Sequence, residues 1–555
     1  MPTHRRSPTS RRPASRANAP VSAAVEEAES PEGAASTSHV VAVEPTTKPS
    51  STSERVTAKR RSRGRALLER ARPLLPRRVY NWAAVQLYWR FSDDRGWQAR
   101  DDEWNDRETP PSEERLRWHA VWLVEAYLPS NIPALLAGLE RLGWQKKDDE
   151  SVADFISNCR LSLGGGGLMH LPMLRPPVDK GSYFPDTLKR DLPLGVKLVT
   201  GQVQIVAYAL TLLIVGFRFD ESVSGEVDVA LRRRYQTFTR RTRAGRSIMH
   251  TTFQRRDAMR DLEAAKIHAC REWLAARVPG YFASTDGGPD TPATALLTTK
   301  VGDLFGDANW MRPVGLGHGV AYEQWGTPIA GLRYTQRSRK DGVPLLFGRE
   351  SDLLGDARLT QNGQSWEWLL PHFVEMQLTE VLGLAALDAT LTNAGQRLAR
   401  LRDSIVTKDT STERQLDSVS RQLRSLSSDI ASLTTEIGGW TAEPAWAFRE
   451  TPEMQVVETL SKQPSDGKPF RVRSIEWITH QAREVGELES TTRDLLLATS
   501  EITSALENIK LQRSVRKLTW VLVGIGVATA ILAFVSAIAA AHGLGWIGPT
   551  SSPLP

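Results

Sequence analysis

The chain has little cysteine for its length of 555 residues: Cys159 and Cys270 are the only two, and they lie far apart in the sequence. Neither belongs to a CxxC pair or to a Cys/His pattern with metal-ligand spacing, which excludes a disulfide framework and a zinc site of the usual kind. The ten histidines contain no HExxH pair. These patterns fit a reducing compartment and predict neither a metal site nor another cofactor.

Phosphate-binding and catalytic motifs are also missing. The glycines at 164–167 are followed by Met169 and His170, where a P-loop has lysine and a hydroxyl residue, so a flexible loop is predicted. Residues 315–319 share only their glycine content with a dinucleotide-binding loop. Residues 286–290 lack the acidic ladder and the terminal glutamate of an EF-hand loop. The sequence therefore assigns no catalytic residue.

The positive charge of the chain is concentrated near its N-terminus. Residues 1–80 hold sixteen Lys/Arg and seven Asp/Glu, a net +9, which leaves about −2 of the total of +7 for the remainder. Residues 1–75 are rich in Ser, Pro, Ala and Arg and are predicted to be disordered, because they cannot bury enough apolar surface to offset the entropy of ordering. The basic cluster at 59–65 is either a solvated tail or a site for anionic lipid or nucleic acid.

No secretory signal is expected, because the first arginines are followed by small and acidic residues and not by an apolar core. The bulk of the chain is therefore expected to stay in the cytoplasm. Folded sequence is predicted from Val79, and residues 79–365 are expected to form an α+β domain. Its strongest strand signal is the apolar stretch 196–219, which predicts one or two buried strands. A membrane span is the weaker alternative there, since the uninterrupted apolar part is too short to cross ~30 Å of hydrocarbon.

Shorter patterns complete this domain. A strand is predicted at 118–127 and a helix at 132–144, and β-like segments lie at 331–334 and 343–347. The order of these elements predicts a sheet with helices on one face.

Arginines form the strongest polar feature of the domain. They lie in residues 227–278, which have good helix formers and no proline, so one long helix or two consecutive helices are predicted. Asp257 is the only acid between 232 and 260. Some of these arginines must be solvated or paired with distant acids; the alternative is a patch for anionic lipid, a polyanion or an acidic partner. The candidate residues of this patch are Arg232, Arg233, Arg234, Arg240, Arg241, Arg243 and Arg246.

Apolar residues that step by three and four predict a helical hairpin over residues 371–440. The first block ends at Ile405 and the second begins at Leu416, eleven residues later and out of phase. Thr410 and Glu413 match a capping box, which favours a turn between two helices over one helix with a stutter.

A linker is predicted at 441–475, followed by a heptad stalk helix at 476–517. The apolar seam of this stalk packs either within the chain or against a second copy, which makes it a candidate surface for homo-oligomerisation. The seam residues are Val485, Leu488, Leu495, Ile502, Leu506 and Ile509.

The stalk leads into an uncharged stretch, residues 518–541, which begins at Leu518 and ends at Ala541. At ~1.5 Å per residue this transmembrane helix is long enough to cross a lipid bilayer. Basic residues precede it, and the short tail at 542–555 contains no Lys or Arg. The positive-inside rule therefore predicts a single-pass protein of the cell membrane, with its bulk in the cytoplasm and its C-terminus outside. The flanking basic residues are Arg513, Arg516 and Lys517.

These patterns favour a membrane-anchored cytoplasmic scaffold or adaptor that acts through protein–protein contacts and through anionic lipid. Two alternatives stay open: a membrane-tethered enzyme with its active site around residues 281–365, and a subunit of a transport or envelope assembly. A deep pocket with converging ionisable residues favours the enzyme, whereas an exposed apolar or cationic surface favours the scaffold. The specific partner or substrate is not encoded in any recognisable motif.

Overall fold

The computed structural model of the chain describes its folded part from Asp94 to Gly543, with gaps. The predicted disordered tail at 1–75, the basic cluster at 59–65 and the loops at 286–290 and 315–319 lie outside the described residues. The described ranges are 94–147, 150–161, 166–177, 187–242, 245–283, 291–303, 309–314, 323–337, 342–360, 365–377, 379–407, 413–438, 440, 454–459 and 467–543.

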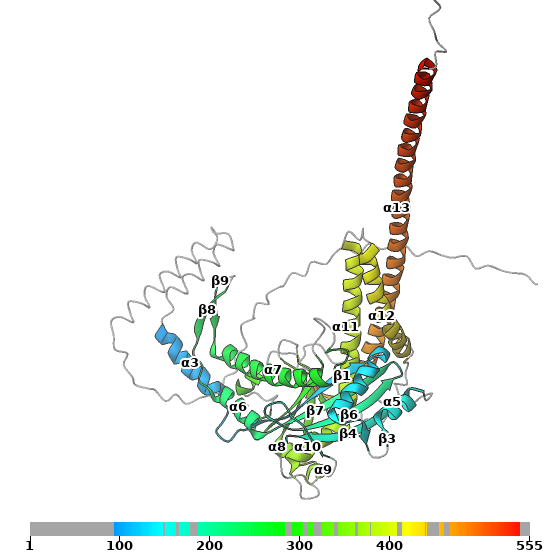
Figure 1. Ribbon diagram of the computed structural model, residues 1–555. Helices are drawn as coiled ribbons and strands as arrows, with labels where there is room; N and C mark the ends of the chain where they lie inside the picture. The colour runs from blue at the N-terminus through cyan, green and yellow to red at the C-terminus, as the bar shows by residue number, and fades with distance from the viewer. Residues whose placement is uncertain are drawn as a thin grey trace, which may run out of the picture. The chain divides into compact units, whose positions relative to one another are not determined.

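A ten-stranded mixed sheet forms the centre of this part, with the strand order β14-β11-β12-β13-β10-β1-β7-β6-β4-β5 (Figure 1). Its pairs are antiparallel except β10 with β13 and β4 with β5. The strands are β1 (Leu116–Tyr127), β4 (Gly167–Arg175), β5 (Thr187–Lys189), β6 (Val196–Ala207), β7 (Leu210–Phe219), β10 (Ala293–Thr299), β11 (Glu323–Gly326), β12 (Leu332–Thr335), β13 (Leu345–Arg349) and β14 (Gln455–Thr459).

The strands β1, β6, β7 and β10 occur in this order in the chain but lie in the order β10-β1-β7-β6 in the sheet. Strands β6 and β7 form an antiparallel hairpin, and helices lie between β1 and β6 and between β7 and β10. This is the split β-α-β arrangement, in which the first strand lies between later ones. The strands predicted at 118–127, 331–334 and 343–347 are confirmed. The stretch 196–219 forms two buried strands, β6 and β7, so the alternative of a membrane span there is wrong.

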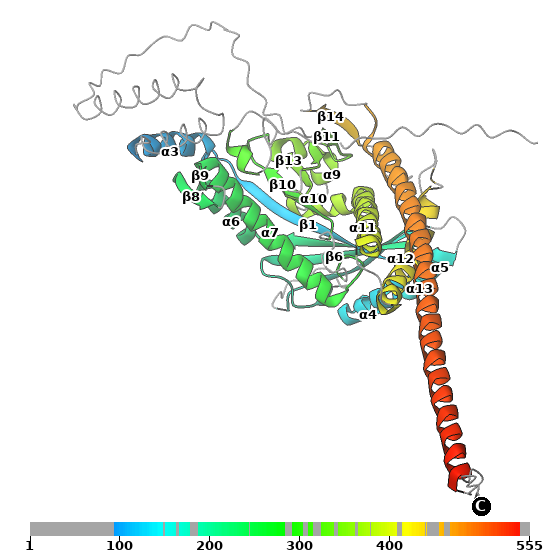
Figure 2. The ribbon, with the colours of Figure 1, turned by 90° about the horizontal axis from the view of Figure 1, so that it is seen from above.

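Helices cover both faces of the sheet, and the prediction of helices on one face is wrong (Figure 2). Alternate side chains of β1 show this: Val121 and Leu123 pack with the helices that precede β10, whereas Trp122 and Val124 pack with the C-terminal helices. The error arises because the C-terminal heptad residues were expected to pack among themselves. Four helices cover the face of the sheet that carries Val121 and Leu123. They are α4 (Ile132–Leu142), α5 (Val152–Leu161), α6 (Glu221–Arg232) and α7 (Thr251–Arg277).

Small elements flank these layers. They are α3 (Asp94–Glu108), the 3-10 helices η2 (Pro129–Asn131) and η3 (Asn309–Val314), the paired strands β2 (Lys146–Lys147) and β3 (Glu150–Ser151), and the short helices α8 (Glu350–Leu353) and α9 (Ala357–Thr360).

The arginine-rich stretch is not one helix or two consecutive ones. Between α6 and α7 the chain forms an antiparallel pair of strands, β8 (Phe238–Thr242) and β9 (Gly245–Met249). Threonines and Phe238 favour extended backbone in β8, and β9 begins at Gly245. The absence of proline was therefore a poor guide to helix.

The C-terminal layer consists of α10 (Trp366–Gln377), α11 (Thr379–Thr407), α12 (Glu413–Gly438) and α13 (Phe470–Gly543). The end of α12, at Leu433, shares a core with Leu384 at the start of α11. The start of α12, at Leu423, shares a core with Ile405 at the end of α11. The two helices are therefore separate and antiparallel. Thr410, the first residue of the predicted capping box, lies in the segment 408–412, outside the described residues, and Glu413 is the first residue of α12.

The predicted linker at 441–475 also needs correction. It contains β14, which pairs antiparallel with β11 at the edge of the sheet, and α13 begins at Phe470, before the predicted start at 476. The strand was missed because five residues of alternating pattern carry little local signal, and its pairing partner lies more than a hundred residues away. From Phe470 the helix continues without a break through the stalk and the apolar stretch.

Candidate functional site

A pocket of about 240 Å³ lies at one end of the sheet, between the strands and two helices. The strand residues that line it come from β1, β4, β6 and β7, and the helical residues come from the start of α6 and from α10. Cationic side chains dominate the strand side: Arg117, Arg175, Lys197 and Arg218.

Arg218 occupies the centre of the strand side and is nearly fully buried, with 3% of its side chain exposed. On β7 it lies opposite Leu198 of β6 and Ala120 of β1. Its Nη1 donates to the backbone oxygen of Trp368 at 3.2 Å, and its guanidinium lies 5.2 Å from the centroid of that indole ring. Its Nε meets no acceptor among the described residues.

A buried carboxylate on α10, Glu375, holds Arg218 from behind the pocket. Its Oε2 accepts from Arg218 Nη2 at 3.3 Å, and its Oε1 accepts from Thr200 Oγ1 at 2.6 Å and from Trp122 Nε1 at 3.2 Å. Because a buried charge is stable only when it is paired and hydrogen-bonded, this network explains why β7 tolerates an arginine in an apolar strand. It also fixes α10 on the sheet.

His119 lies in the same wall and is neutral. Its Nε2 is 2.7 Å from Thr298 Oγ1, and its ring packs edge-on against Trp366. Burial above all, followed by the charges of Arg117 and Lys197, lowers the pKa of His119 to about 3. The imidazole therefore adds no positive charge to the pocket at neutral pH.

Of the other charged residues that line the pocket, some have ion-pair or hydrogen-bond partners and Lys197 has none among the described residues. Arg117 forms an ion pair with Glu367 of α10. Asp220 caps α6, since its Oδ1 accepts from the backbone nitrogen of Ser222 at 2.9 Å. Lys197 forms no hydrogen bond or ion pair with another described residue, and burial followed by the charge of Arg218 lowers the pKa of Lys197, against the opposing effect of the nearby carboxylates.

Trp118 contributes a second buried donor. Its backbone nitrogen donates to Ser224 Oγ at 3.1 Å, and its ring packs edge-on against Phe219 at 5.2 Å. Its Nε1 meets no acceptor among the described residues, although the side chain is buried. The hydroxyl of Ser224, the imidazole of His119 and the carboxylates of Asp220 and Glu367 are thus engaged in structural contacts. Trp118 packs with the core on the α7 side of the sheet, whereas Arg218 pairs with Glu375 on the α10 side.

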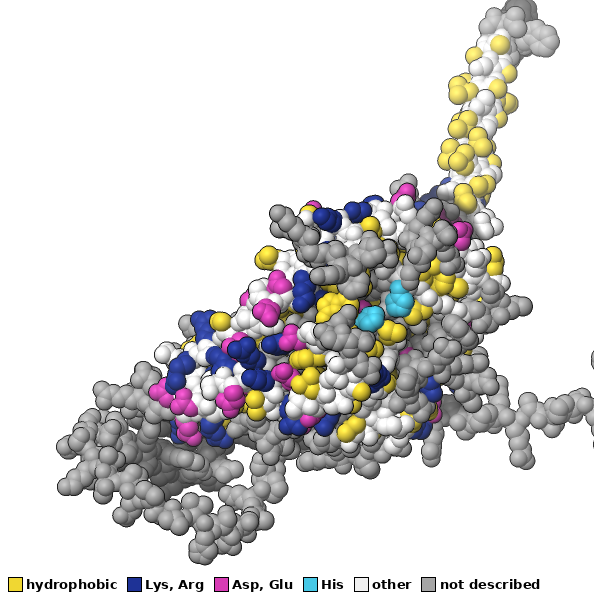
Figure 3. All heavy atoms as spheres, turned by 90° about the horizontal axis from the view of Figure 1, so that it is seen from below, with side chains coloured by type: hydrophobic (Ala, Val, Ile, Leu, Met, Phe, Trp, Pro, Cys, Tyr) yellow, Lys and Arg dark blue, Asp and Glu magenta, His cyan; other side chains and the backbone are white. Residues whose placement is uncertain are grey.

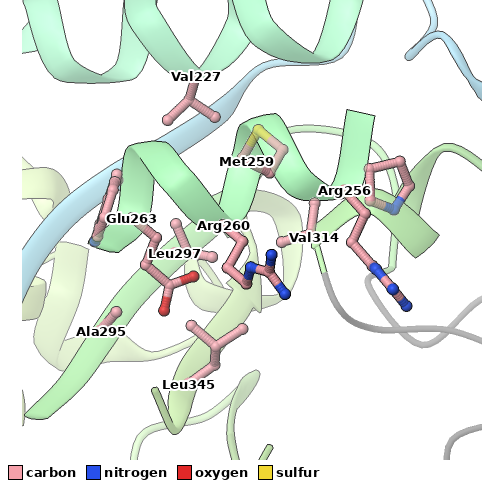
Figure 4. A pocket seen from close by; sticks show the side chains of 11 residues that line it. Val227, Arg256, Met259, Arg260, Glu263, Ala295, Leu297, Val314 and Leu345 are labelled. Carbon is pink, nitrogen blue, oxygen red and sulfur yellow. The ribbon is translucent and has the colours of Figure 1, made fainter. Parts of the chain in front are cut away.

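A second pocket lies under α7 and measures about 20 Å³, the space of a single water molecule. Figure 4 shows Arg260 and Glu263 of α7 beside it, with Ala295 and Leu345 of the sheet below them. Glu263 is committed to the fold, because it pairs with Arg337 and accepts from the backbone nitrogen of Val343 at 2.9 Å. The pocket is too small for a substrate. Across the described residues no group of His, Cys, Asp and Glu converges as a metal site.

Three arginines of the predicted anionic-partner patch have described side chains, and each has a different environment. Arg232 at the end of α6 binds Asp228 and the backbone oxygen of Glu114, and Arg234 pairs with Asp102 and Asp106 of α3. Arg233 is exposed and lies over the ring of Tyr235. Arg240, Arg241 and Arg246 belong to β8 and β9 by their backbone, while their side chains and Arg243 lie outside the description.

The predicted oligomerisation seam is divided by its packing. Val485 is buried in a cluster with α11 and α12, and Leu488 and Leu495 pack against the same cluster. Further along α13 the seam residues are exposed, at 62% for Ile502, 52% for Leu506 and 45% for Ile509. The first half of the seam therefore packs within the chain, and only the second half is available to a partner.

The last part of α13 is apolar and exposed. Within the described residues, α13 is the one helix that is long and apolar enough to cross a membrane, and none of its most apolar window is buried. Figure 3 shows hydrophobic side chains covering this projecting segment. Trp520, Leu532 and Phe534 are each about two-thirds exposed.

Sequence reasoning did not identify the cationic pocket, because its residues come from five separated segments. The enzyme hypothesis placed a site at 281–365, but none of the residues that line the larger pocket comes from that range. One signal was present: Arg218 is the only charged residue of β7, which is otherwise apolar apart from Thr211, and a charge in a buried strand requires a partner. The chain matches no protein-family model and no curated protein sequence.

Proposed function

We propose that the chain is a single-pass, membrane-anchored cytoplasmic adaptor whose α/β domain is held rigidly to its transmembrane helix. One observation supports this proposal: α13 belongs both to the core of the domain and to the apolar segment. Phe470 at its start is buried and packs edge-on against Trp325 at 5.1 Å and Tyr334 at 5.4 Å. The same unbroken helix carries the exposed apolar residues beyond Lys517.

The energetic argument for membrane insertion rests on exposure. Val527, Ile531, Phe534 and Ile538 are each about half or more exposed, and leaving such side chains in water forgoes roughly 1.5–3 kcal/mol apiece. A segment of this kind is stable in hydrocarbon, where the helix satisfies its own backbone hydrogen bonds. Its sidedness follows from Arg513, Arg516 and Lys517, which stand on the domain side of the apolar stretch.

The second part of the proposal is self-association: the exposed part of the α13 seam packs against the same helix of a second copy of this chain. Ile502, Leu506 and Ile509 recur at helical spacing on the part of α13 beyond its contacts with α11 and α12. This seam is continuous with an apolar segment in which small residues recur every fourth position, a pattern that lets helices approach closely. Two copies anchored in one membrane would have their α13 helices parallel, so that the same seam residues of the two helices can pack against each other. The small residues are Thr529, Ala533, Ala537 and Ala541.

Membrane insertion is tested with the full chain expressed in cells and extracted with alkaline carbonate. The wild-type chain is expected in the membrane pellet, as is a control in which Val527, Ile531 and Phe534 are replaced by leucine. Replacing the same three residues by lysine is expected to release the chain, since each charge at the centre of a span disfavours insertion by about 2.5–3.5 kcal/mol. Release of the wild-type chain by carbonate would contradict the proposal.

Sidedness is tested by labelling intact cells with a membrane-impermeant maleimide. A Ser552→Cys variant is expected to react before lysis, because the tail lies outside, whereas Cys159 of the wild type is expected to react only after lysis. Labelling in the reverse order would place the domain outside and overturn the cytoplasmic assignment.

A further inference from the structure

Four basic residues form a cationic face on α13 just before its apolar segment: Lys510, Arg513, Arg516 and Lys517. We infer that this cationic face binds the anionic headgroups of the bilayer, and that the bound lipid promotes the pairing of two α13 helices. The inference rests on the anchoring and the self-association proposed above, and it names the class of lipid that regulates the contact between the two copies.

The four cations share one side of the helix and have little opposing charge. At ~100° per residue they fall within an arc of about 120°. Glu507 is the one acidic residue between 502 and 541. The last ion pair along α13, among the described residues, joins Arg493 to Glu489. The cationic face is therefore available to an anionic partner.

The position of the cations along the helix places them at the level of the lipid headgroups. The apolar segment begins at Leu518, and Trp520, which is about two-thirds exposed, lies in its first turn, where indole rings favour the interface. Arg513 precedes Leu518 by ~7 Å along the axis, and the headgroup layer on each side of the hydrocarbon is roughly 5–7 Å thick. Clusters of about four basic residues at this place attract anionic lipid.

No other part of the described chain covers this face. The packing of α13 against α11 and α12 reaches Leu496, which is buried in their shared cluster, and the helix continues beyond the ends of both (Figure 1). Every residue from 508 to 540 is exposed. About 21 Å of helix separates Leu496 from Lys510. The partners within reach of the face are therefore lipid headgroups and a second α13.

The same cations continue the seam that is proposed to pair. The steps of three and four through Ile502, Leu506 and Ile509 lead next to Arg513 and then to Arg516. In a parallel pair the two copies of each arginine meet across the seam, and like charges at close range repel each other. An anionic headgroup between them accepts hydrogen bonds from both guanidinium groups and offsets this repulsion. Such a lipid binds the pair more tightly than the single helix, so by linkage it must favour pairing.

The test compares neutral with anionic membranes. The full chain with Leu506→Cys is placed in vesicles of phosphatidylcholine alone, or of phosphatidylcholine with phosphatidylglycerol, and the initial rate of disulfide crosslinking is measured at a protein-to-lipid ratio that keeps pairs in the minority. The chain without this substitution gives the background from Cys159 and Cys270. Anionic vesicles are expected to raise the rate at least about fivefold, the effect of one basic side chain at an anionic surface. Molar salt, which shortens the Debye length to about 3 Å, should remove most of this difference.

Two variants separate the seam from general attraction to the membrane. Arg513→Gln with Arg516→Gln should crosslink faster than the parent in neutral vesicles, because the repulsion is gone, and should lose most of the response to anionic lipid. The matched control adds Gln512→Arg and Val515→Arg, which restore the charge beside the membrane on the other side of the helix. This relocated variant is expected to behave like the neutral one.

The outcomes distinguish this inference from the proposed function. Equal crosslinking of the Leu506→Cys chain in the two kinds of vesicle would overturn the inference and leave self-association standing. A full lipid response in the relocated variant would also overturn it, because the response would then not depend on the seam. Absence of crosslinking in both kinds of vesicle would contradict self-association and the inference together, but not membrane anchoring, which carbonate extraction tests separately.

Discussion

The guanidinium Nη1 of Arg255 lies 2.9 Å from Oε2 of Glu108, and neither side chain has any exposed area. Arg255 also donates to Asn105 Oδ1 at 2.9 Å and to the backbone oxygen of Arg233 at 3.2 Å. An arginine from the densest cationic stretch of the chain is thus a core residue that joins α3, α7 and the segment after α6. Its contacts show that composition alone cannot identify an anion-binding surface.

Removing one partner of this buried pair should be strongly destabilising. Arg255→Met leaves the buried Glu108 carboxyl without its ion-pair partner, and is expected to lower the free energy of unfolding by about 3–5 kcal/mol. The neighbouring Arg256→Met, which loses only a contact with the exposed ring of Phe253, should lower it by less than about 1 kcal/mol. Chemical denaturation of the full chain in detergent, followed by tryptophan fluorescence, measures both. Adding Glu108→Leu to Arg255→Met should recover part of the loss; a further loss would contradict the assignment.

A pH-dependent stability is expected from Glu125. Burial raises the pKa of its carboxyl from 4.5 to about 8, although the backbone nitrogens of Phe282 and Ala126 donate to it. The folded chain therefore keeps a proton that the unfolded chain has lost. Stability is highest below pH 4.5, falls as the pH rises to about 8 by at most roughly 1.4 kcal/mol per pH unit, and is constant above that for this group.

Glu125→Gln tests this expectation, because the amide keeps an acceptor oxygen for Phe282 and cannot ionise. The variant should have a flatter dependence of unfolding free energy on pH between 5 and 8. Glu501→Gln on the exposed surface of α13 should keep the wild-type slope. Equal slopes for all three proteins would show that Glu125 is ionised in the folded state throughout this range.

Gly216 is required by the network behind the pocket. A Cβ at this position would lie 2.6 Å from Thr200 Oγ1 and 2.7 Å from both Glu375 Oε1 and Trp122 Nε1. Gly216→Ala should therefore lower the free energy of unfolding by about 1–3 kcal/mol, the range for overpacking a core. Gly225→Ala in α6, where a Cβ meets nothing, should raise it by about 0.5–1 kcal/mol. Changes of the same sign in the two variants would count against this packing.

Disulfide crosslinking tests the proposed contact between two copies of α13. A Leu506→Cys variant in native membranes is expected to form a crosslinked dimer on mild oxidation, because the seam faces the second helix. Asn508→Cys, two residues away and on the opposite side of the helix, should stay monomeric. Equal crosslinking at both positions, or none at either, would argue that the exposed seam does not pair.

The sequence by itself determined the helices of the C-terminal part and the two long buried strands. Helical hydrogen bonds are local, and a repeat of three and four over many turns leaves few alternatives, so α11, α12 and α13 follow from their own residues. The apolar end of α13 is also evident from the sequence, because residues 518–541 contain no charged side chain. Continuous β-branched and aliphatic runs likewise fixed β6 and β7.

Only the tertiary structure decided where charges and partners meet. Arg255 finds Glu108 across 147 residues of chain, Arg218 finds Glu375 across 157, and β14 pairs with an edge strand far upstream. Pairings over such distances depend on which faces pack together, and a local pattern carries no record of them. The cationic pocket, the second helical layer and the division of the α13 seam into a covered and an open half all arise from that packing.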